Sequence, residues 1–311
     1  MTTSLFGKDI LHIKEISKDE VKLVMDTAAR FEKVMNANGR LLNMDGKVLA
    51  TLFYEPSTRT RLSFETAMLR LGGTVVSVAE AKSSSSAAKG ETLYDTGKMI
   101  EGYSDVAVIR HPVLGSAAEL ASGSGKPVIN GGDGAGQHPT QALLDLYTII
   151  KEKGHVEGLT VCLAGDLKNG RTVHSGASLL ANFGVKFVFT APDALKMPAE
   201  ITDSLRNQGI DVYETSNLDE AVKKADVLYM TRIQKERFAD PEEYERLKGS
   251  YEVTAGTVKK AKKGLTIMHP LPRVTEIATE VDAYEGAAYF RQAANGVPVR
   301  MALIALVTGR E

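Results

Sequence analysis

The sequence predicts an α/β protein of two domains, each with a central parallel β-sheet flanked by helices. Two observations predict this class. Short runs rich in branched apolar residues alternate with stretches in which apolar residues recur at helical spacing, which is the order typical of parallel sheets. The alternation stops at a polar, glycine-containing segment, residues 151–158, and then begins again. We take this segment as a linker between the two domains.

Four strands are expected in the first half, with helices between and after them. The strands are the apolar runs 48–54, 74–78, 106–109 and 128–130, and the helices lie near 61–71, 91–101, 115–122 and 139–151. Helical spacing is clear where Phe64, Ala67, Met68 and Leu71 recur at i, i+3, i+4 and i+7, before Gly72 ends the pattern.

The second half repeats this order. Its expected strands are 160–164, 185–190, 211–213, 227–230 and 265–268, and its expected helices lie near 172–182, 198–208, 217–224 and 241–248. Towards the C-terminus, the run 301–307 is apolar on all sides, which indicates a buried segment.

The composition is that of a globular protein without a strong charge. The 311 residues are 43% hydrophobic, and 38 basic residues against 39 acidic ones leave a net charge of −1, so no overall field favours nucleic acid or an anionic membrane. The only cysteine, Cys162, lies in an apolar run, where we expect it to be buried; it excludes an intrachain disulfide and a multi-cysteine zinc site. No signal peptide or membrane-spanning run is visible, so we expect a cytoplasmic protein.

Residues 55–61 form the strongest candidate for a ligand site. They have the sequence Glu-Pro-Ser-Thr-Arg-Thr-Arg, between an expected strand and an expected helix. A helix N-terminus presents unpaired N–H groups and the positive end of the backbone dipole, so this turn can bind a phosphate, with Arg59 or Arg61 adding full charge. The alternative is a hydroxyl-capped helix with two solvated arginines. Arg61, one position further on, is expected to support the helix.

Residues just after the strands are the next candidates, because parallel sheets bind ligands at the carboxyl ends of their strands. These positions are rich in Arg, His and Gln: Arg110, His138, Gln141, Arg171, Arg232, Gln234 and His269. The sequence has no P-loop, G-x-S-x-G turn or H-E-x-x-H helix, so it indicates no nucleotide loop, nucleophile or metal. The remaining chemistry needs anion binding and an oxyanion stabiliser, as in transfer of an acyl group from a phosphate to an amine.

Six motifs, in order along the chain, resemble the catalytic chains of aspartate carbamoyltransferases. They are Ser57-Thr-Arg-Thr-Arg-Leu-Ser-Phe-Glu65, Lys89-Gly-Glu-Thr92, His138-Pro-Thr-Gln141, Gly165-Asp-Leu-Lys-x-Gly-Arg-Thr-Val-His174, Arg232-x-Gln234 and His269-Pro-Leu-Pro-Arg273. The first is typical of the whole carbamoyltransferase superfamily. The last two favour aspartate, because ornithine enzymes carry an H-C-L-P motif and an S-M-G loop where this chain has Pro270 and Arg232-Ile-Gln234.

The resemblance implies a carbamoyltransferase fold and a role for each motif. Residues 1–150, with a C-terminal helix at about 292–311, would bind carbamoyl phosphate, and residues 151–291 would bind aspartate. The residues implied to bind carbamoyl phosphate are Ser57, Thr58, Arg59, Thr60, Arg110, His138, Gln141, Pro270 and Leu271, of which Arg59, Thr60, Arg110 and His138 would be catalytic. The residues implied to bind aspartate are Lys89, Arg171, Arg232, Gln234 and Leu271.

The resemblance also implies an assembly. Ser85 and Lys89 would reach into the active site of a neighbouring subunit, which makes the protein a homotrimer with shared sites. Four successive serines, 83–86, leave the register of Ser85 open. The implied partners are carbamoyl phosphate and L-aspartate, without a cofactor, a metal, nucleic acid or a membrane, and it stays open whether regulatory chains join a larger assembly.

The expected activity is therefore transfer of a carbamoyl group from carbamoyl phosphate to L-aspartate, the committed step of pyrimidine biosynthesis. Three alternatives stay open: transfer to ornithine or another amino acid, a non-catalytic binding protein of the same fold, and a nucleotide-binding α/β protein. His12, His155 and His174 have no assigned role.

Overall fold

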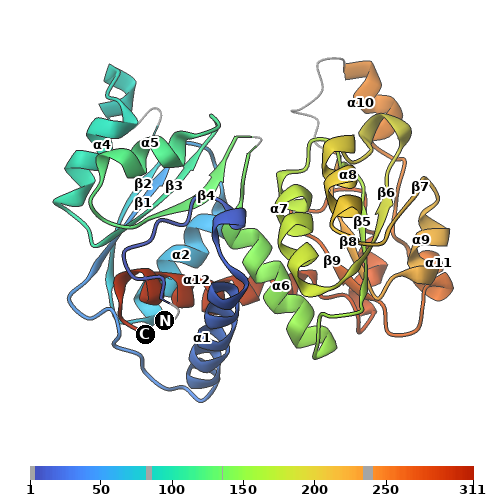
Figure 1. Ribbon diagram of the computed structural model, residues 1–311, viewed down its shortest axis with the longest axis horizontal. Helices are drawn as coiled ribbons and strands as arrows, with labels where there is room; N and C mark the ends of the chain where they lie inside the picture. Colours follow the sequence, from blue (N-terminus) through green and yellow to red (C-terminus); the bar gives the residue numbers. More distant parts are fainter. Residues whose placement is uncertain (1–3, 82–85, 135, 234–240) are drawn as a thin grey trace. The chain divides into compact units, whose positions relative to one another are not determined.

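The computed structural model describes residues 4–81, 86–134, 136–233 and 241–311, and the chain forms two compact units (Figure 1). Unit 1 consists of Met1–Leu144 and Asn295–Glu311, and unit 2 of Asp145–Ala294. Both divisions fall inside long helices, α6 (Pro139–Lys153) and α12 (Tyr289–Thr308). The expected divisions, at residues 150 and 292, lie six residues after the first and three before the second.

Unit 1 is built on a four-stranded parallel sheet in the order β2-β1-β3-β4. Its strands are β1 (Val48–Phe53), β2 (Thr74–Ala79), β3 (Val106–His111) and β4 (Val128–Asp133). The central strands β1 and β3 are mostly buried, whereas the edge strand β2 is largely exposed. All four strands expected in the first half are therefore confirmed.

The helices expected in the first half are found, and the structure adds α1 (Lys18–Asn36) and two short 3-10 helices. Apart from the parts of α6 and α12, the helices of unit 1 are η1 (Ile13–Glu15), α1, α2 (Thr58–Arg70), η2 (Ser86–Lys89), α4 (Leu93–Glu101) and α5 (Ser116–Gly123). Helix α1 is absent from the expected elements. It begins at a capping box, in which the Ser17 hydroxyl accepts the Glu20 N–H and the Glu20 carboxylate accepts the Ser17 N–H.

Unit 2 is built on a five-stranded parallel sheet in the order β7-β6-β5-β8-β9. Its strands are β5 (Thr160–Ala164), β6 (Lys186–Thr190), β7 (Val212–Thr215), β8 (Val227–Met230) and β9 (Thr266–Met268). The five strands expected in the second half are thus confirmed, and with them the predicted fold class of two parallel-sheet domains.

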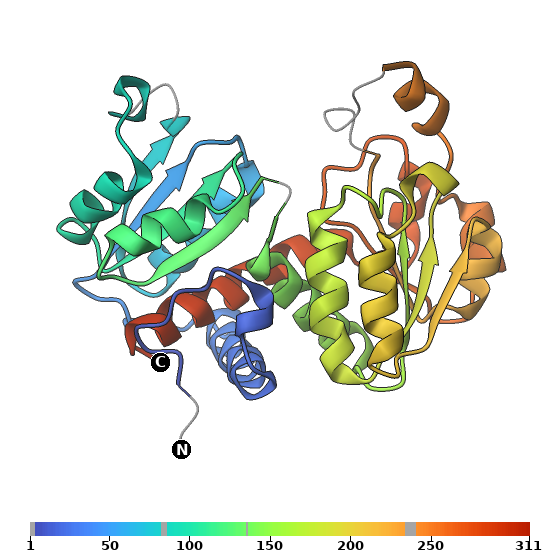
Figure 2. The ribbon, with the colours of Figure 1, turned by 45° about the horizontal axis from the view of Figure 1, so that its top comes forward.

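Helices cover both faces of the second sheet. Figure 2 shows α7 and α8 side by side on one face, and α9 and α11 pack together on the other. The elements are α7 (Arg171–Leu180), η3 (Ala181–Phe183), η4 (Asp193–Leu195), α8 (Ala199–Asn207), α9 (Leu218–Lys224), α10 (Pro241–Leu247), α11 (Ala255–Lys260) and η6 (Thr279–Ala283). Within the described ranges, no helix is both long and apolar enough to cross a bilayer.

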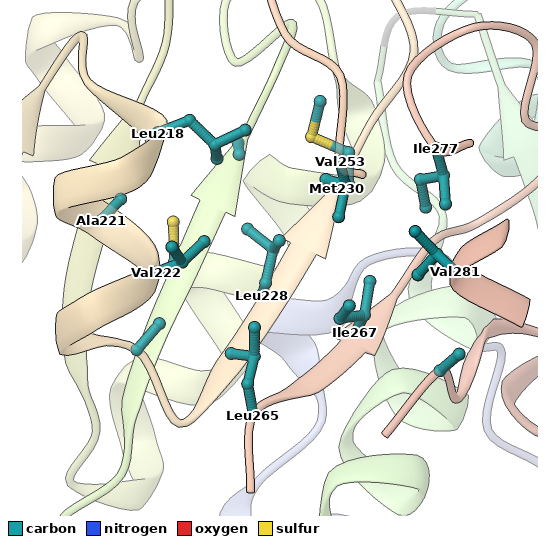
Figure 3. Close-up of a cluster of buried hydrophobic side chains, with 14 of the residues drawn as sticks. Leu218, Ala221, Val222, Leu228, Met230, Val253, Leu265, Ile267, Ile277 and Val281 are labelled. Atoms are coloured by element: carbon teal, nitrogen blue, oxygen red, sulfur yellow. The ribbon is translucent and has the colours of Figure 1, made fainter. Parts of the chain in front are cut away.

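A compact apolar cluster fixes the sheet of unit 2 against α9. In Figure 3, Val222 of α9 faces Leu228 of β8 and Ile267 of β9, and all three side chains are fully buried. Cys162 of β5 belongs to the same cluster, as expected, and burial raises the pKa of its thiol to about 12. Each such aliphatic side chain contributes about 1.5–3 kcal/mol by leaving water, so the cluster holds the strand ends of unit 2 in fixed positions.

Candidate functional site

The turn after β1 forms the N-terminus of helix α2. Ser57 is the N-cap residue, but its hydroxyl accepts no capping hydrogen bond, and the first turn contains no acidic residue. Because the first intrahelical bond runs from Arg61 N–H to the Ser57 carbonyl, the N–H groups of residues 58–60 lie at the open end of the helix. The hydroxyl-capped alternative is therefore wrong, and the Ser57 hydroxyl is available to a ligand.

The side chains at this N-terminus differ in exposure. Thr60 is buried, whereas Thr58 and Arg59 are exposed and Ser57 is half-buried. Arg61 points along the helix, with its Nε 3.7 Å from Glu65 Oε1. This i,i+4 ion pair agrees with the expectation that Arg61 supports the helix, and Arg59 is the exposed arginine of the first turn.

Arg110 lies at the end of β3, beside the turn that begins α2. The strand register pairs Phe53 of β1 with Arg110, so the two candidate segments share one edge of the sheet. The Arg110 side chain is only 11% exposed; its Nη1 donates to the Gly131 carbonyl at 3.2 Å, and its Nη2 lies 3.4 Å from Glu55 Oε2. A guanidinium held in this way is positioned to polarise a carbonyl oxygen.

The neighbouring His111 packs against the residue that follows β1. Its ring packs against Tyr54 with the centroids 4.8 Å apart, and its Nδ1 accepts the Val113 N–H at 3.1 Å. Burial lowers the pKa of His111, so its ring stays neutral near pH 7. No second cation therefore stands at position 111 to repel Arg110.

A glycine-rich loop after β4 leads to His138. The buried Asp133 carboxylate holds this loop by accepting the Gln137 N–H at 2.9 Å, the Asn130 side-chain amide at 3.1 Å and the Gly115 N–H at 3.1 Å. His138 is 4% exposed, and its carbonyl accepts the N–H groups of Gln141 and Ala142, so it sits at the start of α6. Residue 135 of the loop lies outside the described residues.

Strand order therefore gathers half of the candidate residues. β1, β3 and β4 lie at or next to each other in the sheet, and the carboxyl ends of parallel strands meet at one edge. The residues that follow them are Ser57, Thr58, Arg59 and Thr60 after β1, Arg110 at the end of β3, and His138 and Gln141 after β4. Unit 1 thus combines a helix N-terminus without a side-chain cap, a held guanidinium and a buried imidazole.

In unit 2, Thr231 connects the residues that follow β5 and β8. Its N–H donates to the Ala164 carbonyl at 2.9 Å, and its hydroxyl accepts the Asp166 N–H at 3.1 Å. Asp166 is fully buried and receives the Asn169 N–H at 2.9 Å, which shapes the loop before Arg171, the first residue of α7.

Arg171 and Arg232 thus follow neighbouring strands of one sheet, and both side chains are half-buried. Two guanidiniums at one sheet edge suit the binding of carboxylates, which they can grip with two parallel hydrogen bonds.

The segment after β9 carries Pro270 and Leu271, both half-buried. Leu271 has a left-handed backbone, with φ of 56°, and the peptide bond to Pro272 is cis. The Leu271 N–H donates to His269 Nδ1 at 2.8 Å. β9 is the neighbour of β8, so this segment joins Arg171 and Arg232 at the same edge of the sheet.

The loop residues are described only in part. Lys89 ends η2 and is exposed, whereas Ser85 and Gln234 lie outside the described residues. The Asp133 carboxylate, which holds the loop before His138, is absent from the candidates, because no motif marks it. In the described part of the chain, no group of three or more His, Cys, Asp or Glu residues is arranged to hold a metal.

Two family models cover almost the whole chain. The model described as aspartate/ornithine carbamoyltransferase, carbamoyl-P binding domain, matches residues 8–151, and the one described as aspartate/ornithine carbamoyltransferase, Asp/Orn binding domain, matches residues 157–307. The chain belongs to the aspartate/ornithine carbamoyltransferase family. The predicted resemblance to carbamoyltransferases is thus confirmed.

Relatives of this carbamoyltransferase in two organisms are both aspartate carbamoyltransferase catalytic subunits. The chain is 55% identical over 303 residues to the aspartate carbamoyltransferase catalytic subunit of Thermococcus kodakarensis, covering 97% of each chain, and 52% identical to that of Methanocella arvoryzae, with the same coverage.

Solved structures give the same result. The catalytic subunit of M. Jannaschii aspartate transcarbamoylase is 49% identical, with a TM-score of 0.90 and coverage of 96% of this chain and 97% of that one. Aspartate transcarbamoylase from Trypanosoma cruzi, in complex with N-(phosphonacetyl)-L-aspartic acid, is 42% identical, with a TM-score of 0.92 and coverage of 97% and 96%.

Proposed function

We propose that this carbamoyltransferase transfers the carbamoyl group of carbamoyl phosphate to the amino group of L-aspartate, giving N-carbamoyl-L-aspartate and phosphate. The observation that carries the proposal is the identity of 47–55% to aspartate carbamoyltransferase catalytic subunits along nearly the full chain. The reaction is the committed step of pyrimidine biosynthesis. We place the enzyme in the cytoplasm.

Unit 1 would bind carbamoyl phosphate. The N–H groups at the start of α2, with Ser57, Thr58 and Arg59, hold the phosphate, because a helix N-terminus without acidic residues favours an anion. Arg110, His138 and Thr60 polarise the carbamoyl oxygen, and stabilise the negative charge that this oxygen gains as the amine attacks. Gln141 and the main chain around Pro270 and Leu271 hold the carbamoyl amine.

Unit 2 would bind aspartate. Arg171, Arg232 and Gln234 hold its two carboxylates, with further contacts from Lys89 and Leu271. The same guanidiniums repel the cationic side chain of ornithine, so the site discriminates by charge.

The transfer needs no covalent intermediate on the protein. The nitrogen of aspartate forms a bond to the carbamoyl carbon, and the bond from that carbon to the phosphate oxygen breaks with its electron pair. The departing phosphate then takes the proton that the nitrogen loses. This explains why the sequence offers anion-binding groups without a dedicated base.

Activity with each acceptor tests the proposal directly. Purified enzyme is incubated with carbamoyl phosphate and either L-aspartate or L-ornithine, and both phosphate release and the carbamoylated product are measured. We expect product with aspartate. Product with ornithine alone would refute the assignment, and no product with either would favour a non-catalytic binding protein.

The phosphate site has a matched pair of variants on one helix. Arg59 lies at the start of α2 and Arg70 at its end, and both are exposed. Because a charge-assisted hydrogen bond contributes about 1.5–3 kcal/mol, Arg59→Ala should weaken phosphate binding about 10- to 100-fold, and Arg70→Ala should leave it unchanged. Calorimetry with inorganic phosphate measures the affinity of both variants. A rise in the melting temperature of the protein with ATP or NAD, and none with phosphate, would instead favour a nucleotide-binding protein.

We also propose a homotrimer in which Ser85 and Lys89 complete the site of a neighbouring subunit. Chains with Lys89→Ala and chains with Arg59→Ala would each be inactive, and mixed trimers would regain part of the activity, because some sites would combine two intact halves. No recovery in trimers that native mass spectrometry shows to be mixed would mean that Lys89 acts within its own chain.

A further inference from the structure

A buried histidine organises the segment that follows β9. His269 is 1% exposed, and its Nδ1 accepts the Leu271 N–H at 2.8 Å. A main-chain N–H can only donate, so Nδ1 carries no proton in this contact. The ring proton therefore lies on Nε2, which is 2.7 Å from Glu276 Oε1. One tautomer of His269 therefore turns its lone pair to the Leu271 N–H and places its ring proton beside the Glu276 carboxylate.

Glu276 is held in place by its own segment. Its side chain is buried, and its carboxylate also accepts the N–H groups of Val274 at 3.2 Å and Thr275 at 3.1 Å. Burial by itself raises the pKa of Glu276, but the interaction with His269 and the main-chain N–H groups of Glu276 and Val274 bring this pKa below its usual value. The carboxylate is thus ionised at neutral pH, and its charge lies beside the Nε2 side of the imidazole.

The contact with His269 acts on a strained residue. Leu271 has a φ of 56°, a left-handed conformation that is unfavourable for a residue with a Cβ. The hydrogen bond from its N–H to His269 offsets part of that cost. The imidazole therefore determines the direction of the main chain at Pro270 and Leu271.

The main chain of His269 is also anchored. Its N–H donates to Gln292 Oε1 at 2.8 Å, and Gln292 Nε2 donates to Asp145 Oδ1 at 2.6 Å. Gln292 and Asp145 are both buried, on α12 and α6 within unit 2. The His269 end of its contact with Leu271 is consequently held by α12 and α6.

We propose that His269 and Glu276 are positioning residues of carbamoyl transfer: Glu276 fixes the tautomer of His269, and His269 holds the main chain at Leu271 in the shape that receives the carbamoyl amine. This rests on the proposed function, which assigns that main chain to the amine. Neither side chain contacts substrate. Both act through the geometry of Leu271.

Two variants of His269 separate its two contacts. The amide of Asn can take the place of Nδ1, so His269→Asn keeps an acceptor for the Leu271 N–H, whereas the amide of Gln takes the place of Nε2, so His269→Gln loses that acceptor. A misplacement of about 1 Å in an active site can cost a hundredfold in rate. We expect His269→Gln to lower kcat about 10- to 100-fold and His269→Asn to retain much more of it.

Two controls distinguish positioning from general damage. Affinity for inorganic phosphate, which the start of α2 provides, should stay the same in both variants. The same substitution at the exposed His155, His155→Gln, should leave kcat unchanged. Equal kcat in His269→Asn and His269→Gln, with an active wild-type enzyme, overturns the positioning proposal. A wild-type chain without transferase activity overturns the proposed function instead, and the role of His269 with it.

The tautomer is measured without a change in sequence. In protein labelled with ¹⁵N-histidine, a long-range ¹H–¹⁵N spectrum shows which ring nitrogen carries the proton. We expect the Nε2–H form for His269 in the wild type, and a mixture of tautomers with a lower kcat in Glu276→Leu. An Nδ1–H signal from His269 in the wild type overturns the proposal even if the variants fail to fold.

Discussion

Removing the Asp133 carboxylate should loosen the loop that leads to His138. In Asp133→Ala, the Gln137 N–H, the Gly115 N–H and the Asn130 amide all lose an acceptor. An unsatisfied buried donor costs about 1–3 kcal/mol, and water reaches the two main-chain donors in part, so we expect a total loss of about 3–5 kcal/mol in local stability.

Amide hydrogen exchange is the suitable assay, because a protein of two units need not unfold in one step. A loss of about 4 kcal/mol corresponds to roughly a thousandfold faster exchange at Gln137 and Gly115, since about 1.4 kcal/mol is a factor of ten. Asp133→Asn should have a smaller effect. Its single carbonyl oxygen can still accept the bonds that now reach Oδ1, while its NH₂ group faces the Gly115 N–H.

The control is the same substitution at an exposed aspartate of unit 1. Asp26 lies on the solvent side of α1, so Asp26→Ala should change stability by less than about 0.5 kcal/mol. If exchange at Gln137 in Asp133→Ala rises by less than threefold, or if Asp26→Ala has the same effect, the carboxylate does not hold the loop.

Three further predictions concern unit 2. Gly165→Ala should destabilise unit 2 by more than about 2 kcal/mol in urea denaturation, because φ is +105° and a Cβ would lie 2.3 Å from a main-chain oxygen. The control Gly176→Ala lies within α7, where a Cβ would meet no atom within 4 Å, and should be neutral or stabilising. Equal effects of the two substitutions would contradict this prediction. Burial lowers the pKa of His174, so its contribution to stability is complete above the unfolded pKa of about 6.5 and is lost as the pH falls towards the folded value. His174→Gln should therefore flatten the fall in melting temperature between about pH 7 and 5, and an unchanged slope would exclude His174 as the cause. Ile267→Ala, in the buried cluster, should cost about 2–5 kcal/mol, and a loss below about 1 kcal/mol would show that the cavity collapses.

The strands were predictable because each is a short apolar run between polar turns. β1 was expected at 48–54 and is found at Val48–Phe53, and the other strands agree to within three residues at either end. Helix ends were less predictable. Helix α2 was expected from residue 61 but begins at Thr58, because the polar residues of its first turn add nothing to the apolar periodicity. In α12, Pro298 lies within the helix, and because proline usually interrupts a helix, the periodicity alone does not predict the turns before it.

The sequence carries a clear helix signal for α1, although α1 is not among the expected elements. Its capping box is visible as Ser17 and Glu20, and Val21, Val24 and Ala28 mark its buried face at helical spacing. These capping and burial signals are local to the segment, which contains no candidate for catalysis.

The candidate site was predictable only in its general position. The rule that ligands bind at the carboxyl ends of parallel strands identified Arg110 and His138 from sequence position alone. The carboxylates that hold the segments around the site are not predictable in the same way. Glu276 lies seven residues beyond His269 in a segment without regular structure, and only the folded geometry selects it from the 39 acidic residues of the chain.

The buried thiol of Cys162 makes the protein a convenient scaffold for chemical labelling. A pKa of about 12, against 9.0 for an ordinary thiol, lowers the reactive thiolate about a thousandfold, and burial blocks reagents as well. A cysteine introduced at exposed Asp26 or Asp203 would thus be the dominant reactive group of its chain. A fluorophore or spin label could be attached there without removing the native cysteine.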